Sequence, residues 1–473
     1  MSTDALLHPG YFSDGLDRID PLIADAIARE KRRTRDVIEL IASENIVSRA
    51  VLEVQGSVLT NKTVEGLPGK RYHAGAENVD AVERAAIERA CRLFGCSHAN
   101  VQPHSGSQAN HAVLHAVAEP GDTVLSMDLN AGGHLSHGAS ANASSRWFRF
   151  VHYGVRADDG LIDYDAVVDL ARQHRPKLLI AGGSAYPRAL DFAAFRRAAD
   201  AGGARLLVDM AHFAGLVAGG AHPSPFPHAD IVTTTTYKSL RGPRGALVLW
   251  NDPALRKPID RAVFPGMQGT PSLHIVAAKA VALGEALRPE FRAYAQAVLA
   301  NARALAARLQ GRGFDLVGGG TDTPLMLVDL RRQGLDGALS AQSLERAGII
   351  ANMNPIPSDA ADLQRMSGLR FGVSGATTRG LGRREIEAVG DLVAEVLAGL
   401  QRGPDASAAA EEAVRRRVAE LVAPYPTQSR AGARACSQAT RSAVTASRLL
   451  SFRISCRAPG YSRTVTSASP AAR

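Results

Sequence analysis

The chain has 473 residues, of which 45% are hydrophobic and 21% are charged, a composition typical of ordinary globular proteins. Its length suits two or three domains, and its apolar runs are too short to predict a membrane-spanning helix. The N-terminus is acidic and polar and lacks the basic and then apolar segments of a secretory signal. The four cysteines form neither a disulfide framework nor a metal-binding spacing. Both observations indicate a cytoplasmic protein.

The net charge of +9 is concentrated at the C-terminal end of the chain. No Asp or Glu follows Glu420, whereas eight arginines lie from Arg430 to Arg473 and leave only +1 for the first 429 residues. Because large apolar residues are also few there, we expect residues 426–473 to form a disordered tail rich in Arg, Ser and Ala. The charge is therefore weak evidence for a nucleic-acid partner. A contact of the tail with nucleic acid or acidic lipid stays open as a minor alternative.

Strand-like apolar runs alternate with helical patterns over the first half of the chain. Val79, Ile87, Ala90 and Phe94 share one helical face, for example. This alternation is typical of an α/β fold with a mostly parallel sheet that helices cover on both sides. Ligands of such sheets bind beyond the carboxyl ends of the strands. The seven expected strands are Ala99–Gln102, Thr123–Met127, Phe148–Tyr153, Leu178–Ala181, Arg205–Val208, Asp230–Thr233 and Ala246–Leu249.

The pattern changes from about Phe264 onward. Two long Ala-rich helices are expected there, followed by a smaller α/β unit with two strands and a final helix. These elements are the helices Ser272–Leu287 and Glu290–Leu309, the strands Leu325–Leu330 and Leu369–Gly372, and the helix Arg384–Leu400. We therefore divide the chain into an N-terminal helical arm (1–50), a large domain (51–285), a small C-terminal α/β domain (286–425) and the tail (426–473).

Lys238 is one of only seven lysines, and it follows a strand end that is rich in threonine. A lysine at the mouth of a sheet can bond covalently to the aldehyde of a cofactor such as pyridoxal phosphate. Asp209 ends an apolar strand one strand–helix–strand step earlier. A buried carboxylate there needs a partner, for example a protonated pyridine nitrogen. A surface lysine and a helix-capping aspartate are the plain alternatives.

Three further motifs indicate where such a cofactor and its substrate would bind. Small residues at Ser105 and Gly106 precede a helical run, and backbone N–H groups at such a helix start can hold phosphate. Arg370 lies inside an apolar strand and needs an anion, either a substrate carboxylate or a structural ion pair. His134 and His137 stand among glycines, where a His ring can stack on a planar cofactor. We expect no metal, because no Cys or carboxylate completes a site nearby in the sequence.

Together these motifs resemble the serine hydroxymethyltransferase family of fold-type I pyridoxal-phosphate enzymes. The resemblance covers roughly Asp36 to Leu400 and implies an aspartate-aminotransferase-like fold, in which a large domain with a seven-stranded mixed sheet precedes a small C-terminal α/β domain. The ordered blocks that carry it are Glu39–Asn45, Gly69–Tyr72, Asn100–Asn110, Val208–His212, Thr233–Thr236 with Lys238, and Gly242–Gly245.

The resemblance implies reversible transfer of a one-carbon unit from L-serine to tetrahydrofolate, which gives glycine and 5,10-methylenetetrahydrofolate. The cofactor would be pyridoxal 5'-phosphate, bound covalently to Lys238, with tetrahydrofolate as co-substrate. The family builds each active site from two chains, so a homodimer or a tetramer is implied. A 2-methylserine hydroxymethyltransferase that produces D-alanine and a folate-independent 3-hydroxy amino acid aldolase stay open as alternatives.

The same resemblance implies a role for each residue of the site. Asp209 would pair with the pyridine nitrogen, and Ser184 and His212 would bind near the ring hydroxyl. Glu65 would transfer a proton near the folate and reach in from the partner chain together with Tyr72. The implied catalytic residues are Lys238, Glu65, Asp209 and Tyr72; those at the cofactor are Ser105, Gly106, His134, Ser184, Asp209, His212, Thr235, Lys238 and Gly269; those at the amino acid are Ser43, Glu65 and Arg370; and those at folate are Leu129, Gly133, Leu135 and Asn354.

Four positions depart from the family's pattern. Tyr237 stands where a His usually precedes the lysine, and Thr63 stands where a Tyr of the neighbouring chain contacts the phosphate. His73 replaces the second Tyr of a pair, and Thr270 replaces the second Gly of a pair that follows Gln. These changes are either neutral drift or the mark of a branch with an altered substrate.

Overall fold

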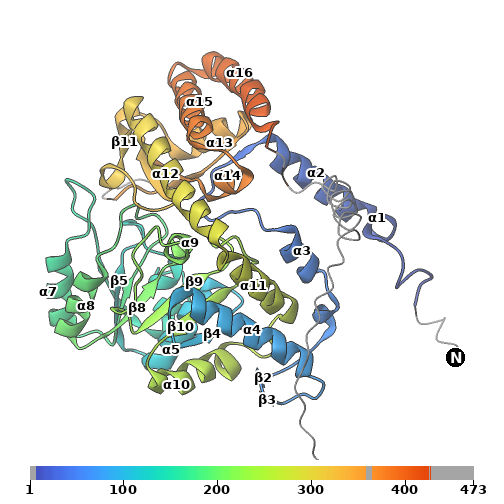
Figure 1. The fold of residues 1–473 in the computed structure, drawn as a ribbon. Coiled ribbons are helices and arrows are strands. Elements are labelled where there is room, and N and C mark those ends of the chain that lie inside the picture. Colours follow the sequence, from blue (N-terminus) through green and yellow to red (C-terminus); the bar gives the residue numbers. More distant parts are fainter. Residues whose placement is uncertain (1–6, 358, 360–364, 426, 428–473) are drawn as a thin grey trace, which may run out of the picture. The chain divides into compact units, whose positions relative to one another are not determined.

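A seven-stranded mixed sheet forms the centre of the chain in the computed structural model, which describes residues 7–357, 359, 365–425 and 427 (Figure 1). Its strands are β4 (His98–Asn100), β5 (Thr123–Met127), β6 (Arg149–Tyr153), β7 (Leu178–Ala181), β8 (Arg205–Asp209), β9 (Ile231–Thr235) and β10 (Ala246–Trp250). The strand order is β4–β10–β9–β8–β7–β5–β6. Neighbours from β9 to β6 run parallel, and β10 runs antiparallel to both β4 and β9. All seven expected strands are confirmed, with ends that shift by a residue or two.

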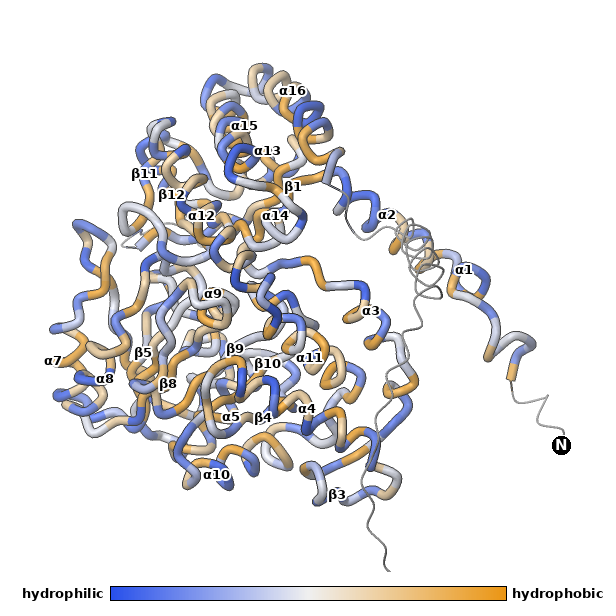
Figure 2. Tube along the Cα trace, viewed as in Figure 1, coloured by the Kyte–Doolittle hydropathy of each residue, from blue (hydrophilic) through white to orange (hydrophobic). Residues whose placement is uncertain are grey.

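Helices cover both faces of this sheet because successive strand residues point to opposite sides. On β8, Leu206 and Val208 belong to one buried cluster, whereas Leu207 belongs to another. The helices of this part are α4 (Glu77–Phe94), α5 (Gly106–Val117), α6 (Ser144–Trp147), α7 (Tyr164–His174), α8 (Phe192–Gly202), α9 (Ala214–Ala218) and α10 (Arg256–Arg261). α5 lies against β9 and β10, α7 against β5 and β6, and α8 against β7 and β8. Figure 2 accordingly shows hydrophobic, orange segments in the interior around β8.

A second sheet has four antiparallel strands in the order β11–β12–β15–β14. These strands are β11 (Asp315–Leu316), β12 (Leu325–Asp329), β14 (Asn352–Asn354) and β15 (Gly368–Gly372). The helices of this half are α11 (Leu273–Ala286), α12 (Pro289–Gly311), α13 (Gly337–Arg346), α14 (Ser374–Arg379), α15 (Arg383–Gln401) and α16 (Pro404–Val422). The two expected long helices and the two expected strands are confirmed as α11, α12, β12 and β15.

The expectation that the helix over Arg384–Leu400 is the last one is wrong. After Gly403 the chain continues into α16, which packs along α15. Val414, Val418 and Val422 of α16 are buried. Their spacing of four residues places them on one face of a helix, so the signal for a further amphipathic helix was present in the sequence.

The N-terminal arm contains α1 (Leu16–Ile19) and α2 (Pro21–Asp36), neither of which has a buried residue in the single chain. α2 begins where the side chain of Asp20 accepts a hydrogen bond from a backbone N–H of its first turn. β1 (Ile38–Glu39) then pairs in parallel with β13 (Ile349–Ile350), which comes from the far end of the chain. Helices therefore occupy part of residues 1–50, and the strand β1 within this range was not expected from the sequence.

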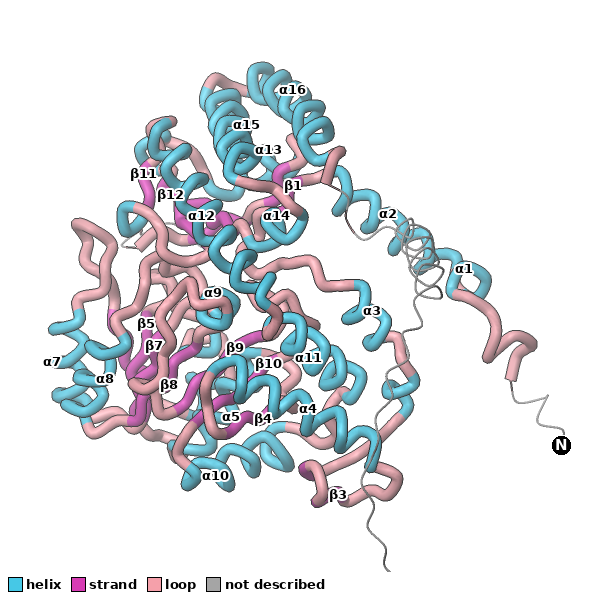
Figure 3. The backbone as a smooth tube through the Cα atoms, in the orientation of Figure 1, coloured by secondary structure: helices cyan, strands magenta, loops and turns pink. Residues whose placement is uncertain are grey.

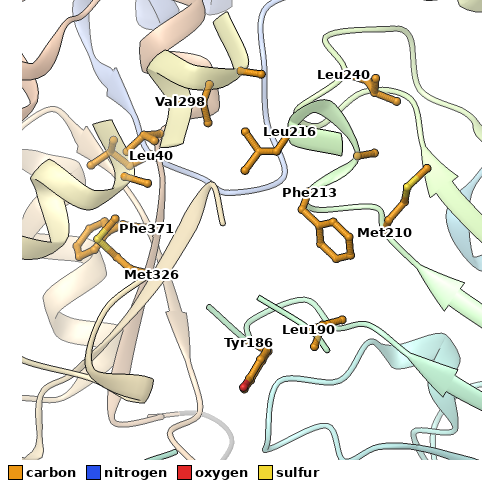
Figure 4. Packing of buried hydrophobic residues seen from close by; sticks show 14 of the residues in the cluster. Leu40, Tyr186, Leu190, Met210, Phe213, Leu216, Leu240, Val298, Met326 and Phe371 are labelled. Atoms are coloured by element: carbon orange, nitrogen blue, oxygen red, sulfur yellow. The ribbon is translucent and has the colours of Figure 1, made fainter. Parts of the chain in front are cut away.

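The segment after β1 is tied into the core of the small sheet. The backbone N–H of Gly372 donates to the carbonyl of Leu40 at 2.7 Å. Leu40 belongs to the same buried cluster as Met326 and Phe371, and Figure 4 shows the three side chains on neighbouring elements. Contacts join the described residues up to Thr427 into one compact unit. The domain boundaries at residues 50 and 285 therefore stay a prediction.

Two acidic residues lie on the buried face of α4, beside the expected apolar ones. Between the arm and this helix lie α3 (Arg49–Gln55) and the hairpin of β2 (Gly66–Leu67) and β3 (Lys70–Arg71). Val79 and Phe94 are buried as expected, but Asp80 and Glu83 are buried too. Both carboxylates form ion pairs with the buried guanidinium of Arg71, at 2.8 Å and 2.6 Å. Apolar periodicity alone could not reveal these two charges as part of the core.

No helix among the described residues is long and apolar enough to cross a membrane. Cys91 and Cys96 are free thiols. The predicted disordered tail at 426–473 lies outside the described residues apart from Thr427, so its state and its contacts stay predictions.

Candidate active site

The predicted site residues gather in loops that follow the carboxyl ends of the central strands, drawn pink in Figure 3. Asp209 is the last residue of β8, and Lys238 comes three residues after β9 ends. His134 lies in the loop after β5, Ser184 in the loop after β7, and Ser105 at the turn from β4 into α5. Parallel strands bring these loops to one edge of the sheet, which is where ligands of such folds bind.

Asp209 is buried, and three neighbouring groups lie within hydrogen-bond distance of its carboxylate. Asn110 Nδ2 donates to its Oδ2 at 2.8 Å, His137 Nε2 lies 3.0 Å from the same oxygen, and the N–H of Ala211 donates to Oδ1. Burial raises the pKa of Asp209, but the His137 hydrogen bond and nearby positive charge outweigh it and hold the pKa well below the usual range. The helix-cap alternative is wrong, because α9 begins after Phe213. An ionised carboxylate here fits a protonated ring nitrogen.

His134 and His137 lie close to Asp209, with one ligating atom of each residue within 4.8 Å of the others. The argument that no carboxylate stands near the two histidines was therefore wrong, because the fold brings one from a distant strand. His134 Nδ1 is 2.7 Å from the hydroxyl of Ser136. Burial and the neighbouring His137 lower the pKa of His134 to about 4, so its ring is neutral and suited to stacking. The absence of a resident metal stays a prediction.

Lys238 is a buried lysine rather than a surface one, with 5% of its residue surface exposed. Burial lowers the pKa of its ammonium to about 8, although the carboxylate of Asp209 acts in the opposite direction. A substantial fraction of neutral amine is therefore present near neutral pH, which is the form that attacks an aldehyde. Asn45 Nδ2 donates to the Lys238 carbonyl at 2.8 Å and holds the loop in place.

The turn into α5 has the features of a phosphate cradle. Ser105 caps the helix, and its hydroxyl accepts a hydrogen bond from the N–H of Gln108 at 3.2 Å. A Cβ on Gly106 would lie 2.9 Å from the Thr235 side chain, so the two loops meet closely. The hydroxyl of Thr235 and both polar atoms of the Gln108 amide are buried without a hydrogen-bond partner among the described residues. Such unpaired groups at a helix start fit an anionic ligand like the cofactor phosphate.

Arg370 is the clearest candidate for binding a substrate carboxylate. Its guanidinium donates to the carbonyl of Ser184 at 2.7 Å and to Asn352 at 3.3 Å. Within the described ranges no carboxylate lies within ion-pair distance, so the structural ion-pair alternative is not borne out. Burial alone lowers the pKa of Arg370 to about 10, and it stays cationic at neutral pH. A partly buried cation that lacks a carboxylate partner among the described residues favours a bidentate anion.

Ser43 and His212 approach this cation from two other segments. Gly372 of β15 packs so tightly on Ala42 that a Cβ would lie 2.3 Å from the Ala42 Cα, which brings the adjacent Ser43 to the strand of Arg370. His212 is buried, and burial followed by the charges of Lys238 and Arg370 holds its pKa well below the usual range. The imidazole of His212 is therefore neutral.

Glu65, Tyr72 and Gly269 lie on segments outside the loops that follow the central strands. Gly269 is next to Glu65, since a Cβ there would be 3.2 Å from Oε1, and Tyr72 is 79% exposed in the single chain. Over the described ranges, no hydrogen bond or ion pair joins these three residues to Lys238.

The four residues expected at folate lie on two segments. Leu129 and Leu135 are exposed apolar side chains in the loop after β5. Gly133 lies between them and permits a tight turn, because a Cβ there would be 2.3 Å from the carbonyl oxygen of Met127. Asn354 ends β14, and its amide donates to Pro355. The exposure of Leu129 and Leu135 leaves these two side chains accessible to a planar ligand.

Two residues that hold Asp209 were not assigned this role from the sequence. Asn110 lies one turn into α5, and His137 lies one short turn after His134. A signal existed for both, since polar residues on otherwise small or apolar stretches need buried partners. Their common partner, Asp209, is distant in sequence and could not be identified without the fold.

Comparisons with known proteins agree with this geometry. The family model described as serine hydroxymethyltransferase matches residues 16–393. The chain is 58% identical over 431 residues to the serine hydroxymethyltransferase of Sphingopyxis alaskensis, which covers 90% of this chain and 99% of that protein. It is 59% identical over 416 residues to that of Rhodospirillum centenum, with 88% and 97% covered. It is also 58% identical over 417 residues to serine hydroxymethyltransferase 2 of Rhodospirillum rubrum, with 88% and 97% covered.

These matches confirm the fold-type I prediction, together with pyridoxal phosphate as cofactor and tetrahydrofolate as co-substrate of the family. The seven-stranded mixed sheet and the buried Lys238 and Asp209 agree with that assignment. The chain belongs to the serine hydroxymethyltransferase family.

Proposed function

We propose that this chain transfers a one-carbon unit reversibly from L-serine to tetrahydrofolate and forms glycine and 5,10-methylenetetrahydrofolate. The observation that best supports this proposal is the partly buried guanidinium of Arg370, which has no ion-pair partner among the described residues and acts electrostatically on Lys238. An α-amino acid held at Lys238 needs a nearby cation to bind its carboxylate. The relatives named above carry the name of this activity.

Each residue has a distinct task in the proposed reaction. Pyridoxal phosphate supplies an electron-withdrawing ring when it is bound. Lys238 offers a neutral amine to the aldehyde, and ionised Asp209 keeps a proton on the ring nitrogen. Arg370 orients the amino acid by its carboxylate, and Glu65 moves the proton between substrate hydroxyl and folate.

A product assay tests the activity directly. Purified protein, loaded with pyridoxal phosphate, is given L-serine with and without tetrahydrofolate, and glycine and methylenetetrahydrofolate are quantified. We expect both products in equal amounts, and only when folate is present. Equal glycine formation without folate would instead support the aldolase alternative. Faster formation of D-alanine from 2-methylserine would support the 2-methylserine enzyme.

We also infer a cytoplasmic homodimer with shared active sites, from which a tetramer could assemble. Leu22, Ile23 and Ile27 of α2 are exposed large apolar residues in the single chain, as expected of a helix that packs on a partner. Tyr72 is exposed, and no hydrogen bond or ion pair joins Glu65 to Lys238 among the described residues, which supports a site that a second chain completes. A twofold dimer places the same loop of each chain in the site of the other.

Mixed dimers give a direct test of the shared site. Neither Lys238→Ala nor Glu65→Gln chains should be active alone. In a co-expressed random mixture, half of the dimers carry one chain of each kind, and each of these holds one intact site. We therefore expect about a quarter of the wild-type turnover per chain. A mixture as inactive as the two parents would show that Lys238 and Glu65 act within one chain.

Tyr237 is the observation that keeps a second substrate, 2-methylserine, under consideration. Its half-buried ring lies 4.6 Å from the guanidinium carbon of Arg244. Both residues line a cavity of about 290 Å³ that Ser43 also borders. A phenol engaged with Arg244 cannot serve as the donor and acceptor that an imidazole provides beside the lysine. The space at the substrate α-carbon can therefore differ from that in family members that have His directly before the lysine.

We expect Tyr237→His, combined with Thr63→Tyr and His73→Tyr, to shift turnover from 2-methylserine towards serine. One methyl group accommodated in a pocket is worth roughly 10–200-fold in specificity, which sets the expected shift. The ratio of kcat/KM for the two substrates measures it. The single variant Thr270→Gly, which restores the fourth departure, serves as a control. An unchanged ratio in the triple variant would mean that these positions are neutral drift.

A further inference from the structure

Lys279 is a second fully buried lysine, and the reaction described above does not use it. It lies in the middle of α11, and 1% of its surface is exposed. Its Nζ donates to the carbonyl oxygens of Val101 at 2.7 Å, Pro103 at 2.8 Å and Ala246 at 3.0 Å. An ammonium has three N–H donors, so every donor of Lys279 is used on backbone.

The three carbonyls belong to two segments that border the cofactor site. Val101 and Pro103 continue the line of β4 towards Ser105. Ala246 begins β10, directly after the loop that follows Lys238, and its N–H donates to Pro103 at 3.0 Å. Lys279 therefore links two segments. One is the stretch from Val101 to Pro103 that precedes the phosphate cradle, and the other is the start of β10 at Ala246, which follows the loop of Lys238.

The contacts of Lys279 require its charged form. A neutral amine has two N–H donors and would lose one of the three hydrogen bonds to these carbonyls. Burial lowers the pKa of Lys279 to about 7, and the carboxylate of Glu83 acts against that change. No carboxylate among the described residues lies within ion-pair distance of Lys279. A cation kept in the core without a salt bridge is costly, which indicates a specific task for the carbonyls it holds.

The packing around Lys279 is shaped for this side chain. A Cβ on Gly245 would lie 2.3 Å from the Lys279 Cε, so the glycine leaves the channel through which the side chain passes. The carbonyl of the same Gly245 accepts a hydrogen bond from the N–H of Thr236 at 3.0 Å, next to the unpaired hydroxyl of Thr235. Displacement of Lys279 would thus disturb both strands that flank the cradle.

We propose that Lys279 is a positioning residue for the cofactor phosphate: by binding the carbonyls of Val101, Pro103 and Ala246, it sets the turn of Ser105 and Gly106 against Thr235. This proposal rests on the assignment of that turn as the phosphate cradle. Lys279 itself touches neither the substrate nor the reacting atoms. Its effect reaches the cofactor only through the backbone that it holds.

The test compares two ligands that differ only in the phosphate. Apoenzyme of the wild type, Lys279→Met and Lys279→Gln is titrated with pyridoxal 5'-phosphate and with pyridoxal. We expect Lys279→Met to bind pyridoxal phosphate about tenfold more weakly, while the affinity for pyridoxal changes by about twofold or less. Lys279→Gln, which retains two N–H donors, should lie between the wild type and Lys279→Met.

Two further variants separate positioning from general stability. Gly245→Ala keeps the charge but displaces the Lys279 side chain, and it should reproduce the loss if Lys279→Met does not fold. Arg379→Met is the matched control, because Arg379 also binds backbone carbonyls, those of Val37 and Tyr425, far from the cradle in the sequence and on other elements. Arg379→Met should lower the urea concentration at which half of the apoenzyme is unfolded. It should not change the ratio of the affinity for pyridoxal 5'-phosphate to the affinity for pyridoxal.

The outcomes distinguish this inference from the cradle assignment. Equal losses for both ligands in the Lys279 variants, or no loss, would overturn the positioning role and leave a structural one. Ser105→Ala should also lower the ratio of the affinity for pyridoxal 5'-phosphate to the affinity for pyridoxal. If it does not, the cradle assignment fails and the proposal fails with it. If Ser105→Ala lowers the ratio and the Lys279 and Gly245 variants do not, only the positioning role is refuted.

Discussion

Replacing Lys238 with alanine is expected to abolish covalent retention of pyridoxal phosphate and to lower turnover by roughly 10³-fold or more. Lys238 is the buried lysine beside Asp209 at the carboxyl edge of the sheet, and its pKa of about 8 leaves neutral amine near physiological pH. Below that pH the amine becomes protonated and cannot attack the aldehyde. Attachment of the cofactor to the wild-type apoenzyme should therefore quicken as pH rises and level off above about 8.

Borohydride reduction followed by peptide mapping locates the attachment. The label should fall on the peptide that contains Lys238 and should be absent from Lys238→Ala. Lys257→Ala, which removes an exposed lysine of α10, is the matched control and should retain both label and turnover. A label on any other lysine would contradict the assignment of Lys238.

Arg370→Ala should weaken the binding of L-serine and glycine by at least about tenfold while the cofactor stays bound. Truncating one partner of a buried charge pair typically costs about 2–5 kcal/mol. Arg370 is partly buried, and among the described residues its guanidinium donates to the Ser184 carbonyl and to Asn352 but meets no carboxylate, so a substrate carboxylate would be its counter-ion. Spectral titration of the loaded protein with each amino acid measures the dissociation constants.

Two control variants sharpen this prediction. Arg370→Lys keeps the charge but loses the fork of donors, so amino-acid affinity should fall between those of the wild type and Arg370→Ala. Arg384→Ala removes an exposed arginine at the start of α15 and should bind amino acids normally. Normal amino-acid binding by Arg370→Ala would refute its role as the carboxylate-binding residue.

The central sheet could be predicted because its strands are buried on both faces and therefore appear as continuous apolar runs between helical patterns. The proximity of Asp209 and Lys238 could be expected as well, since adjacent parallel strands end at one edge. The spacing of Val414, Val418 and Val422 also predicts α16, because residues four positions apart lie on one face of a helix.

Other parts of the site depend on contacts between distant segments and left no periodic signal. The ion pairs of Arg71 with Asp80 and Glu83 bury charges on a face where only apolar residues were expected. His137 meets Asp209 from another strand loop, so a histidine among glycines gave no sign of its carboxylate partner. Lys279 resembles any surface lysine in an Ala-rich helix until the fold places three carbonyls around it.

The pairing of β1 with β13 sets an order in which the parts of the chain can reach their final state during synthesis. β1 emerges first from the ribosome, but its partner at Ile349–Ile350 follows only after the whole central sheet has been made. At roughly 5–20 residues per second, that interval lasts tens of seconds. Ile38 and Leu40, buried in the finished protein, therefore remain without their native partners while β4 to β10 assemble. The N-terminal segment of a nascent chain is thus expected to expose these apolar side chains until the small sheet has been completed.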